Sequence, residues 1–204
     1  MPRDKIESHE RIVNAARAEF LEFGFQGASM RSIGNRAGLT CAALYRHYKD
    51  KEDMFDDLVS PAIRAIKSWY ANHKEENYKK INLGVKEEKL FDSNAIDFVR
   101  NEIYKNETEF KLLLNSAKGS KYENFIHIVI NICQEDFQEA LRYMKEKGLK
   151  VKLISNEEMH IIMSAYIVAL FEPIIHNYPK DKIEQYLNTI EDFFMPGWKN
   201  LMGF

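Results

Sequence analysis

Glycine and proline are scarce in this chain, and their scarcity constrains its fold more than any other feature. The 204 residues include only nine glycines and five prolines. A β-sandwich or barrel needs many tight turns, which these two residues usually supply, so such folds are disfavoured and long helices are favoured. The chain is also 45% hydrophobic, which is enough to bury a core and to exclude disorder as its main state.

Apolar residues recur at helical spacing along most of the sequence. We therefore expect an all-α fold of about nine helices with no strand. Beyond residue 50, the expected helices start near residue 51 and then cover about 89–105, 107–117, 122–147, 155–177 and 181–201. The polar stretch 72–89 is expected to be a mobile boundary.

The first fifty residues carry a helix-turn-helix pattern. A first amphipathic helix is expected to end at Gly24, since glycine tolerates the backbone that stops a helix. Two short helices follow, with Ser29 and Thr40 as their N-caps, and Gly38 lies in the tight turn between them. The sequence therefore predicts a three-helix N-terminal domain.

Charge is distributed unevenly between this domain and the rest of the chain. Residues 1–51 contain nine Lys and Arg against six Asp and Glu, a net of +3, whereas the remainder has 20 against 25, a net of −5. A basic N-terminal part on an acidic body predicts that the first part meets a polyanion. A random scatter of charges is the alternative.

Two segments of this region closely resemble the DNA-binding domain of the TetR family of transcriptional regulators: GFQGASMRSIGNRAGLT at 24–40 and LYRHYKDKE at 44–52. Segments 110–114 and 193–199 have a looser likeness to the ligand-binding half of such proteins. The resemblance implies a homodimeric, ligand-responsive regulator, a repressor of a palindromic operator in double-stranded DNA. It places the DNA-binding domain at 1–51 and a helical bundle domain for ligand binding and dimerisation at 52–204.

A recognition helix fits the major groove, where its first side chains meet base edges while neighbouring residues contact phosphates. The small side chains at 41–43 cannot make bidentate hydrogen bonds to bases, so Arg31, Arg46 and DNA shape are expected to discriminate between sequences. The resemblance assigns phosphate contact to Tyr45, His47 and Lys51. The full predicted set is Ser29, Arg31, Thr40, Cys41, Ala42, Ala43, Tyr45, Arg46, His47 and Lys51.

A small-molecule pocket is expected inside the body, because aromatic and Met residues there could form apolar walls with a few polar points. Each of these residues could equally be an ordinary core residue. The predicted ligand-binding residues are Trp69, Tyr70, Phe98, Tyr104, Tyr122, Phe125, His127, Cys133, His160 and Met163.

Dimerisation is expected through the last two long helices, whose apolar residues cover more than one stripe and need partners on two sides. The predicted dimer-interface residues are Met163, Ile167, Leu170, Phe171, Ile174, Leu187, Ile190 and Phe194.

Other function classes receive little support from the sequence. Two cysteines, Cys41 and Cys133, cannot supply a disulfide framework or a closed zinc site, so we expect a reduced, cytoplasmic setting with no metal and no cofactor. No catalytic motif and no membrane span is expected. Two rivals stay open: an effector-free DNA-binding protein of the same fold in chromosome organisation, and a helical-bundle enzyme or metal protein with a DNA-binding module.

Overall fold

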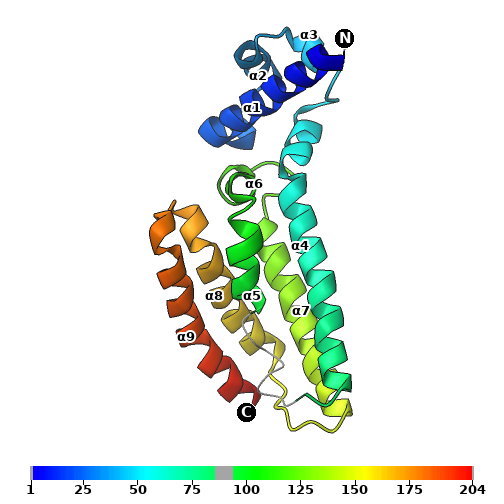
Figure 1. Cartoon of the computed structure of the whole chain (residues 1–204), viewed down its shortest axis with the longest axis vertical. Coiled ribbons are helices and arrows are strands. Elements are labelled where there is room, and N and C mark those ends of the chain that lie inside the picture. The colour runs from blue at the N-terminus through cyan, green and yellow to red at the C-terminus, as the bar shows by residue number, and fades with distance from the viewer. Residues whose placement is uncertain (1, 86–93, 204) are drawn as a thin grey trace. The chain divides into compact units, whose positions relative to one another are not determined.

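The computed structural model describes residues 2–85 and 94–203, and within these ranges the chain is helical without strands, as predicted. Figure 1 shows the course of the chain. The α-helices are α1 (Pro2–Gly27), α2 (Met30–Ala37), α3 (Cys41–Leu44), α4 (Lys51–Asn82), α5 (Asn94–Phe98), α6 (Glu107–Lys111), α7 (Phe125–Glu146), α8 (Asn156–Ile175) and α9 (Ile183–Met202). Two π-helices, η2 (Val99–Ile103) and η3 (Leu112–Ser116), continue α5 and α6, and the 3₁₀-helix η4 (Lys180–Lys182) precedes α9.

The chain divides into two compact units. The N-terminal unit comprises Met1–Arg64 and Asn106–Phe125, and the body unit comprises Ala65–Lys105 and Ile126–Phe204. This division differs from the functional boundary predicted between residues 51 and 52, because the start of α4 and the α6–η3 segment pack with the first three helices. Within the N-terminal unit, Arg17 of α1 donates a hydrogen bond to Glu109 of α6 at 3.1 Å.

An aromatic cluster forms the centre of the N-terminal unit. Phe20, Phe25 and Phe55 are buried, with ring centroids 5.0 to 5.9 Å apart. The chain can bring Phe20 and Phe25 together because Gly24 has a φ of 69° and a ψ of 171°, which interrupts the helix. The predicted end of the first regular helix at Gly24 is thus confirmed.

The expected mobile boundary at 72–89 is wrong for most of its length, because α4 continues to Asn82. Its polar residues pair with a neighbouring helix. Lys74 lies 3.2 Å from Asp136 and 2.8 Å from Glu139 of α7, and the Tyr78 ring packs 4.8 Å from that of Tyr143. Residues 86–89, and residues 89–93 of the helix expected at 89–105, lie outside the described residues.

Helix α8 is the apolar centre of the body unit. It starts with the capping box expected from its sequence, in which Ser155 Oγ accepts from the Glu158 amide and the Glu158 side chain accepts from the Ser155 amide. By length and composition alone, α8 could cross a membrane. Many of its apolar side chains are instead buried inside the unit, where α8 and α9 lie side by side.

Candidate functional site

Two capped turns build the helix-turn-helix of the N-terminal unit. Ser29 Oγ accepts a hydrogen bond from the Ser32 amide at 3.1 Å, and Thr40 Oγ1 accepts one from the Ala43 amide at the same distance. Between them, Gly38 adopts φ 66° and ψ 33°. This left-handed conformation closes a Schellman turn, since the Leu39 amide donates to the Gly34 carbonyl.

Gly34 makes this turn tight, a role that the sequence analysis missed. A Cβ at position 34 would lie 3.1 Å from the Leu39 carbonyl oxygen and 3.5 Å from the Cys41 amide nitrogen. Only glycine therefore lets α2 approach the start of α3 this closely without a backbone shift. A glycine inside a short amphipathic helix was the available signal.

Several predicted DNA-contacting side chains project into solvent. Arg31, Arg46 and His47 are exposed, and Tyr45 is 52% exposed. Within the described part of the chain, no ion pair engages Arg31 or Arg46. By contrast, Arg36, on the other side of α2, pairs with Glu19 at 2.8 Å and also with Glu22.

The first residues of α3 are small, as the sequence requires. Thr40 and Ala42 are exposed, whereas Cys41 and Ala43 are half-buried. Leu44 is fully buried and anchors the helix to the unit's core. The exposed surface at the start of α3 therefore carries the Ala42 methyl group and the Thr40 hydroxyl. Longer polar side chains nearby come from Arg31, Tyr45 and Arg46.

Lys51 is engaged inside the N-terminal unit. Its Nζ donates to the Phe25 carbonyl at 2.6 Å and to the Ala28 carbonyl at 3.0 Å, and lies 4.5 Å from the centre of the Phe25 ring. A lysine at the end of a helix commonly satisfies such carbonyls. Phosphate contact by Lys51 stays a prediction, and two of its three N–H donors are already used.

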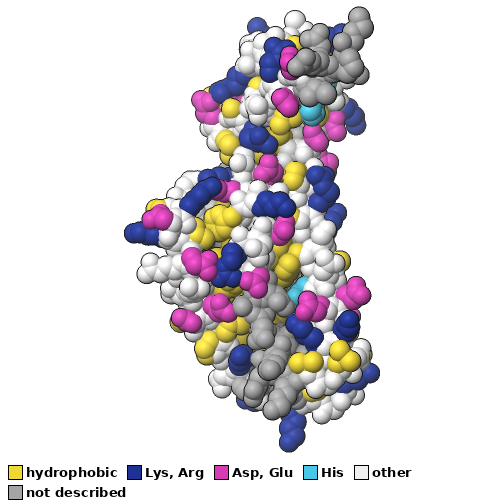
Figure 2. Space-filling model, in the orientation of Figure 1, with side chains coloured by type: hydrophobic (Ala, Val, Ile, Leu, Met, Phe, Trp, Pro, Cys, Tyr) yellow, Lys and Arg dark blue, Asp and Glu magenta, His cyan; other side chains and the backbone are white. Residues whose placement is uncertain are grey.

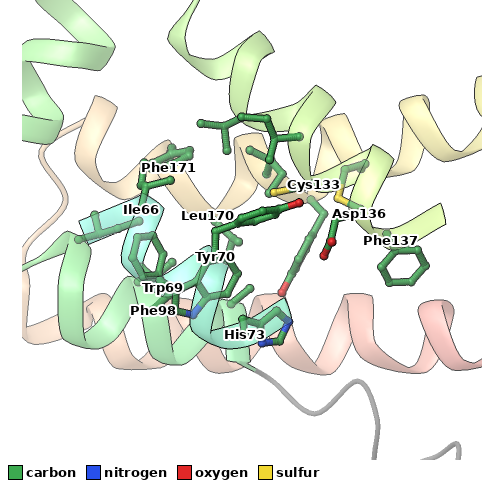
Figure 3. A pocket seen from close by; sticks show the side chains of 18 of the residues that line it. Ile66, Trp69, Tyr70, His73, Phe98, Cys133, Asp136, Phe137, Leu170 and Phe171 are labelled. Carbon is green, nitrogen blue, oxygen red and sulfur yellow. The ribbon is translucent and has the colours of Figure 1, made fainter. Parts of the chain in front are cut away.

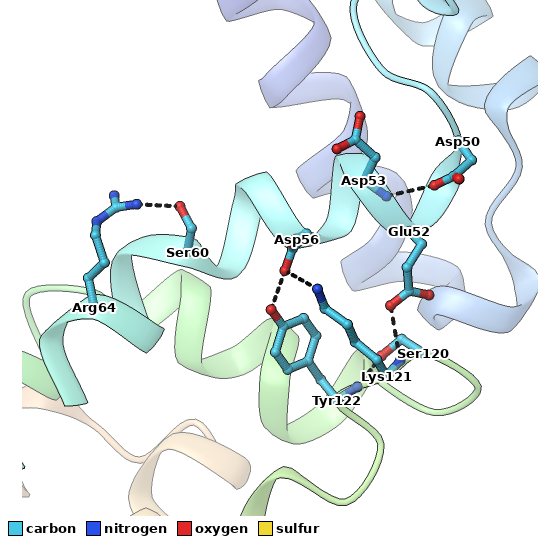
Figure 4. Close-up of polar contacts among 9 residues, drawn as sticks. All are labelled: Asp50, Glu52, Asp53, Asp56, Ser60, Arg64, Ser120, Lys121 and Tyr122. Carbon is cyan, nitrogen blue, oxygen red and sulfur yellow. Dashed lines mark hydrogen bonds and ion pairs between the residues drawn. The ribbon is translucent and has the colours of Figure 1, made fainter. Parts of the chain in front are cut away.

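The start of α4 is tied to the segment that precedes α7 (Figure 4). Glu52 Oε1 accepts from the Lys121 amide at 3.0 Å, and Asp56 receives Lys121 Nζ at 2.8 Å together with the Tyr122 hydroxyl. Burial raises the pKa of Asp56, but these hydrogen bonds outweigh it and leave that pKa below its ordinary value. Tyr122, predicted to bind ligand, is thereby placed in the N-terminal unit.

A cavity of about 170 Å³ lies inside the body unit (Figure 3). Its walls come from α4, α5, η2, α7, α8 and α9. Of the predicted ligand-binding residues, the five that line it are Trp69, Tyr70, Phe98, Cys133 and Met163.

The other five predicted ligand-binding residues do not line this cavity. Tyr122 and Phe125 belong to the N-terminal unit. His127 and His160 are exposed, and His160 Nδ1 lies 3.0 Å from the side-chain oxygen of Gln134. Tyr104 follows η2 but is also absent from the cavity wall.

Three polar residues of the cavity were not predicted from the sequence: His73, Asn77 and Asp136. Two of them lie in the stretch that was interpreted as a boundary. Burial lowers the pKa of His73, so its imidazole is neutral at pH 7. Burial, and to a lesser extent the neighbouring Asp136, raises the pKa of the Cys133 thiol to about 12, so Cys133 stays protonated.

The predicted dimer-interface residues face the interior of their own chain. Seven of the eight are buried within this single chain, and Phe194 is half-buried against Tyr166, with ring centroids 5.1 Å apart. This placement corrects the choice of residues, because an apolar stripe on a hairpin packs within the hairpin first. The exposed faces of α8 and α9 instead carry Ile161 and Phe193, which are 68% and 76% exposed. In Figure 2, hydrophobic side chains reach the surface in the region of these helices.

No group of three or more His, Cys, Asp or Glu side chains positioned to hold a metal ion occurs within residues 2–85 and 94–203. Glu172 and His176, four residues apart, form an ion pair at 3.0 Å.

The N-terminal segment matches a known family. Residues 12–58 match the model of the bacterial regulatory proteins of the tetR family. An HTH-type transcriptional regulator of Staphylococcus aureus (strain bovine RF122 / ET3-1) is 41% identical over 54 residues, and one of strain USA300 is 39% identical over 54 residues. These matches span 26% of this chain and only 29% of each relative. The resemblance to the TetR family predicted from the sequence is confirmed.

Solved structures share the fold over nearly the whole chain. The TetR family transcriptional regulator PfmR from Thermus thermophilus is 20% identical, with 92% of this chain and 95% of that chain covered and a TM-score of 0.57. The fatty acid degradation regulator FadR from Bacillus halodurans is 16% identical, with 93% and 95% covered and a TM-score of 0.54. MexZ, a repressor from Pseudomonas aeruginosa, is also 16% identical, with 96% and 95% covered and a TM-score of 0.54. Identities this low show the common fold alone.

Proposed function

We propose that this chain is a cytoplasmic, ligand-responsive transcriptional repressor that binds a palindromic operator as a homodimer and leaves it when a small molecule fills the body cavity. The observation that carries the proposal is the exposed polar face of the helix-turn-helix. Arg31, Tyr45, Arg46 and His47 extend from it toward solvent. Duplex DNA offers phosphates and base edges to such groups.

Chain connectivity supports coupling between the cavity and the DNA-binding helices. Helix α4 begins at Lys51 in the N-terminal unit and carries Trp69 and Tyr70 to the cavity. The cavity residue Ile103 ends η2, and α6 of the N-terminal unit begins four residues later at Glu107. A ligand that displaces these walls therefore acts on two covalent connections to the N-terminal unit.

A second copy of the chain supplies the second half-site contact. One short recognition helix makes too few contacts for tight specific binding, and two-fold symmetry doubles them. The exposed faces of α8 and α9, with Ile161 and Phe193, are the proposed contact surface. Packing across a two-fold axis then produces a four-helix bundle.

The cavity favours this proposal over its effector-free rival. A protein of chromosome organisation has no need of a cavity in its body, whereas this one is lined by aromatic side chains from five α-helices. An enzyme or metal protein is the weaker rival, since Asp136 and Cys133 are the cavity's ionisable groups besides its tyrosines and a neutral histidine.

The test is selection of a binding site from random duplex DNA, followed by titration at several salt concentrations. Arg31→Ala and Arg46→Ala are each expected to weaken binding to the selected site and to relax preference at particular bases. Lys67→Ala, which removes an exposed cation from α4 in the body unit, is the matched control. Full affinity and selectivity in both arginine variants would refute the assignment of this surface to DNA.

A further inference from the structure

The polar groups of the cavity present hydrogen-bond acceptors and one negative charge. Among the residues that line it, Asp136 is the single residue of the Asp, Glu, Lys and Arg class. The described residues of the lining include no lysine or arginine, so a carboxylate or phosphate ligand would find no counter-ion among them. His73 adds no positive charge at neutral pH because its burial keeps the imidazole neutral.

Asn77 lines the cavity and carries an unused hydrogen-bond acceptor. The residue is 9% exposed, and its Nδ2 lies 2.9 Å from His73 Nε2. Because an amide Nδ2 can only donate, His73 Nε2 is the acceptor of this hydrogen bond. Asn77 Oδ1 is buried without a hydrogen-bond partner in the described chain. A buried acceptor in this state is costly, and a ligand N–H donor would satisfy it.

Asp136 keeps an excess of negative charge beside the cavity even though it has a basic neighbour. Lys74 Nζ lies 3.2 Å from Asp136 Oδ1, but the same ammonium lies closer, at 2.8 Å, to Glu139 Oε2. One lysine between two carboxylates leaves the group with a formal charge of −1. Figure 3 shows the Asp136 carboxylate directed into the space between α4 and α7.

Aromatic rings share the rest of the wall with aliphatic side chains such as Ile66, Val99 and Ile167. Trp69 stacks on His73 with centroids 4.9 Å apart and meets Phe98 at 4.8 Å, and Tyr166 meets Trp198 edge-on at 6.1 Å. The faces of Trp and Tyr attract cations. The cavity volume of about 170 Å³ is close to the roughly 150 Å³ that admits a benzene molecule. The site therefore suits a ligand of about one ring with a compact head group.

We propose that this cavity binds a small organic cation, an aryl-alkyl ammonium or similar amine, with Asp136 and Asn77 receiving its N–H donors and the rings of Trp69 and Tyr166 enclosing its body. The inference rests on the proposed function, since it names the chemical class of the effector. It excludes anionic ligands of the same size.

Intrinsic fluorescence provides the readout, because the only two tryptophans of the chain, Trp69 and Trp198, both line the cavity. Three probes of one shape are titrated at neutral pH: 2-phenylethylammonium, 2-phenylethanol and 3-phenylpropanoate. The ammonium is expected to change the fluorescence saturably and to bind at least about tenfold more tightly than the other two. Equal or tighter binding of the carboxylate, or no saturable change with the ammonium, overturns the proposal.

Two matched variants locate the effect. Asp136→Asn removes the cavity carboxylate and is expected to weaken ammonium binding at least about tenfold while leaving the alcohol unaffected. Glu139→Gln removes an equal charge from the same lysine outside the cavity wall and is expected to change binding less than about twofold. Unchanged ammonium binding in a folded Asp136→Asn variant overturns the proposal. If that variant does not fold, the three probes on the unaltered protein decide.

A parallel titration of operator DNA separates the two proposals. Ammonium binding that leaves DNA affinity unchanged supports this chemistry of the cavity but refutes its role as the effector site. A carboxylate that fills the cavity and releases DNA supports the effector site and overturns the cation inference.

Discussion

Lys51 lies at the start of the fourth helix, as the sequence predicts, but its contacts inside the protein could not be predicted from the sequence. The family resemblance assigned it to phosphate contact, which stays a prediction, and in the structure its ammonium donates to the carbonyls of Phe25 and Ala28. The sequence identifies Lys51 as a cation at this position. The carbonyl groups that accept its hydrogen bonds, however, lie at the end of α1, 23 to 26 residues earlier in the chain. Tertiary proximity of that kind has no local signature.

Replacement of Lys51 is therefore expected to act on stability. Lys51→Met keeps the aliphatic stem near the Phe25 ring but removes two hydrogen bonds from a charged donor, which is expected to lower the free energy of unfolding by about 1–2 kcal/mol. Arg31→Met, at an exposed position, is expected to change it by less than about 0.5 kcal/mol. Urea denaturation monitored by circular dichroism measures both. Equal stability of the two variants would contradict the capping role.

His73 is expected to make stability depend on pH. Its folded-state pKa is lowered from 6.5 by burial, so the unfolded chain binds its proton first as the pH falls. The contribution of the neutral ring is present above about pH 6.5 and is lost as the pH falls through the lower, folded-state pKa. Thermal unfolding at pH 7.5 and 5.5 measures this loss, and His73→Gln should reduce it. An identical pH dependence in the variant would show that other groups are responsible.

At the scale of elements, the sequence predicted helices well where caps and periodicity agree. The Ser29 and Thr40 caps, the Gly24 break and the Ser155 capping box are local features, and all are present. The polar stretch after residue 72 was misinterpreted because its partners, including Asp136, come from α7, more than fifty residues away. The π-helices η2 and η3 likewise had no signal in apolar spacing.

Gly38 offers a test of the turn that sets α3 against α2. Its φ of 66° is strained for most residues with a Cβ, and a Cβ there would meet only Arg11 Nη1 at an ordinary contact distance of 4.0 Å, so the backbone conformation determines most of the cost. Gly38→Ala is expected to lower the free energy of unfolding by about 1 kcal/mol, and Gly38→Asn by less, because asparagine tolerates this conformation. Thermal denaturation ranks the two. A more stable alanine variant would contradict the Schellman turn.

For the whole molecule, the sequence predicted the all-α class and the position of the helix-turn-helix segment, but only half of the predicted ligand-binding residues line the cavity. Helical periodicity shows which face of each helix is apolar, but it does not show which other helix that face packs against. Leu187, for example, was assigned to a second copy and is fully buried by its own chain. Conversely, Ile161 and Phe193 remain exposed on the same two helices.

Dimerisation is expected to depend on these exposed residues. A double variant, Ile161→Glu with Phe193→Glu, should remain folded and become monomeric, because it places four carboxylates in the symmetric interface. Phe171→Glu should instead unfold the body, since Phe171 is buried within the chain. Analytical ultracentrifugation and circular dichroism distinguish the two results. A folded dimer from the double variant would require another interface.

The proposed function requires the body cavity and the helix-turn-helix to be energetically coupled. Titration of a cavity ligand into the protein, followed by tryptophan fluorescence with and without the selected operator, measures this coupling directly. Coupling of about 1–3 kcal/mol predicts that operator DNA weakens the ligand about 5- to 150-fold, and that the ligand weakens DNA by the same factor. Equal ligand affinity in both conditions, for every compound that fills the cavity, would show that the cavity and the helix-turn-helix are not coupled.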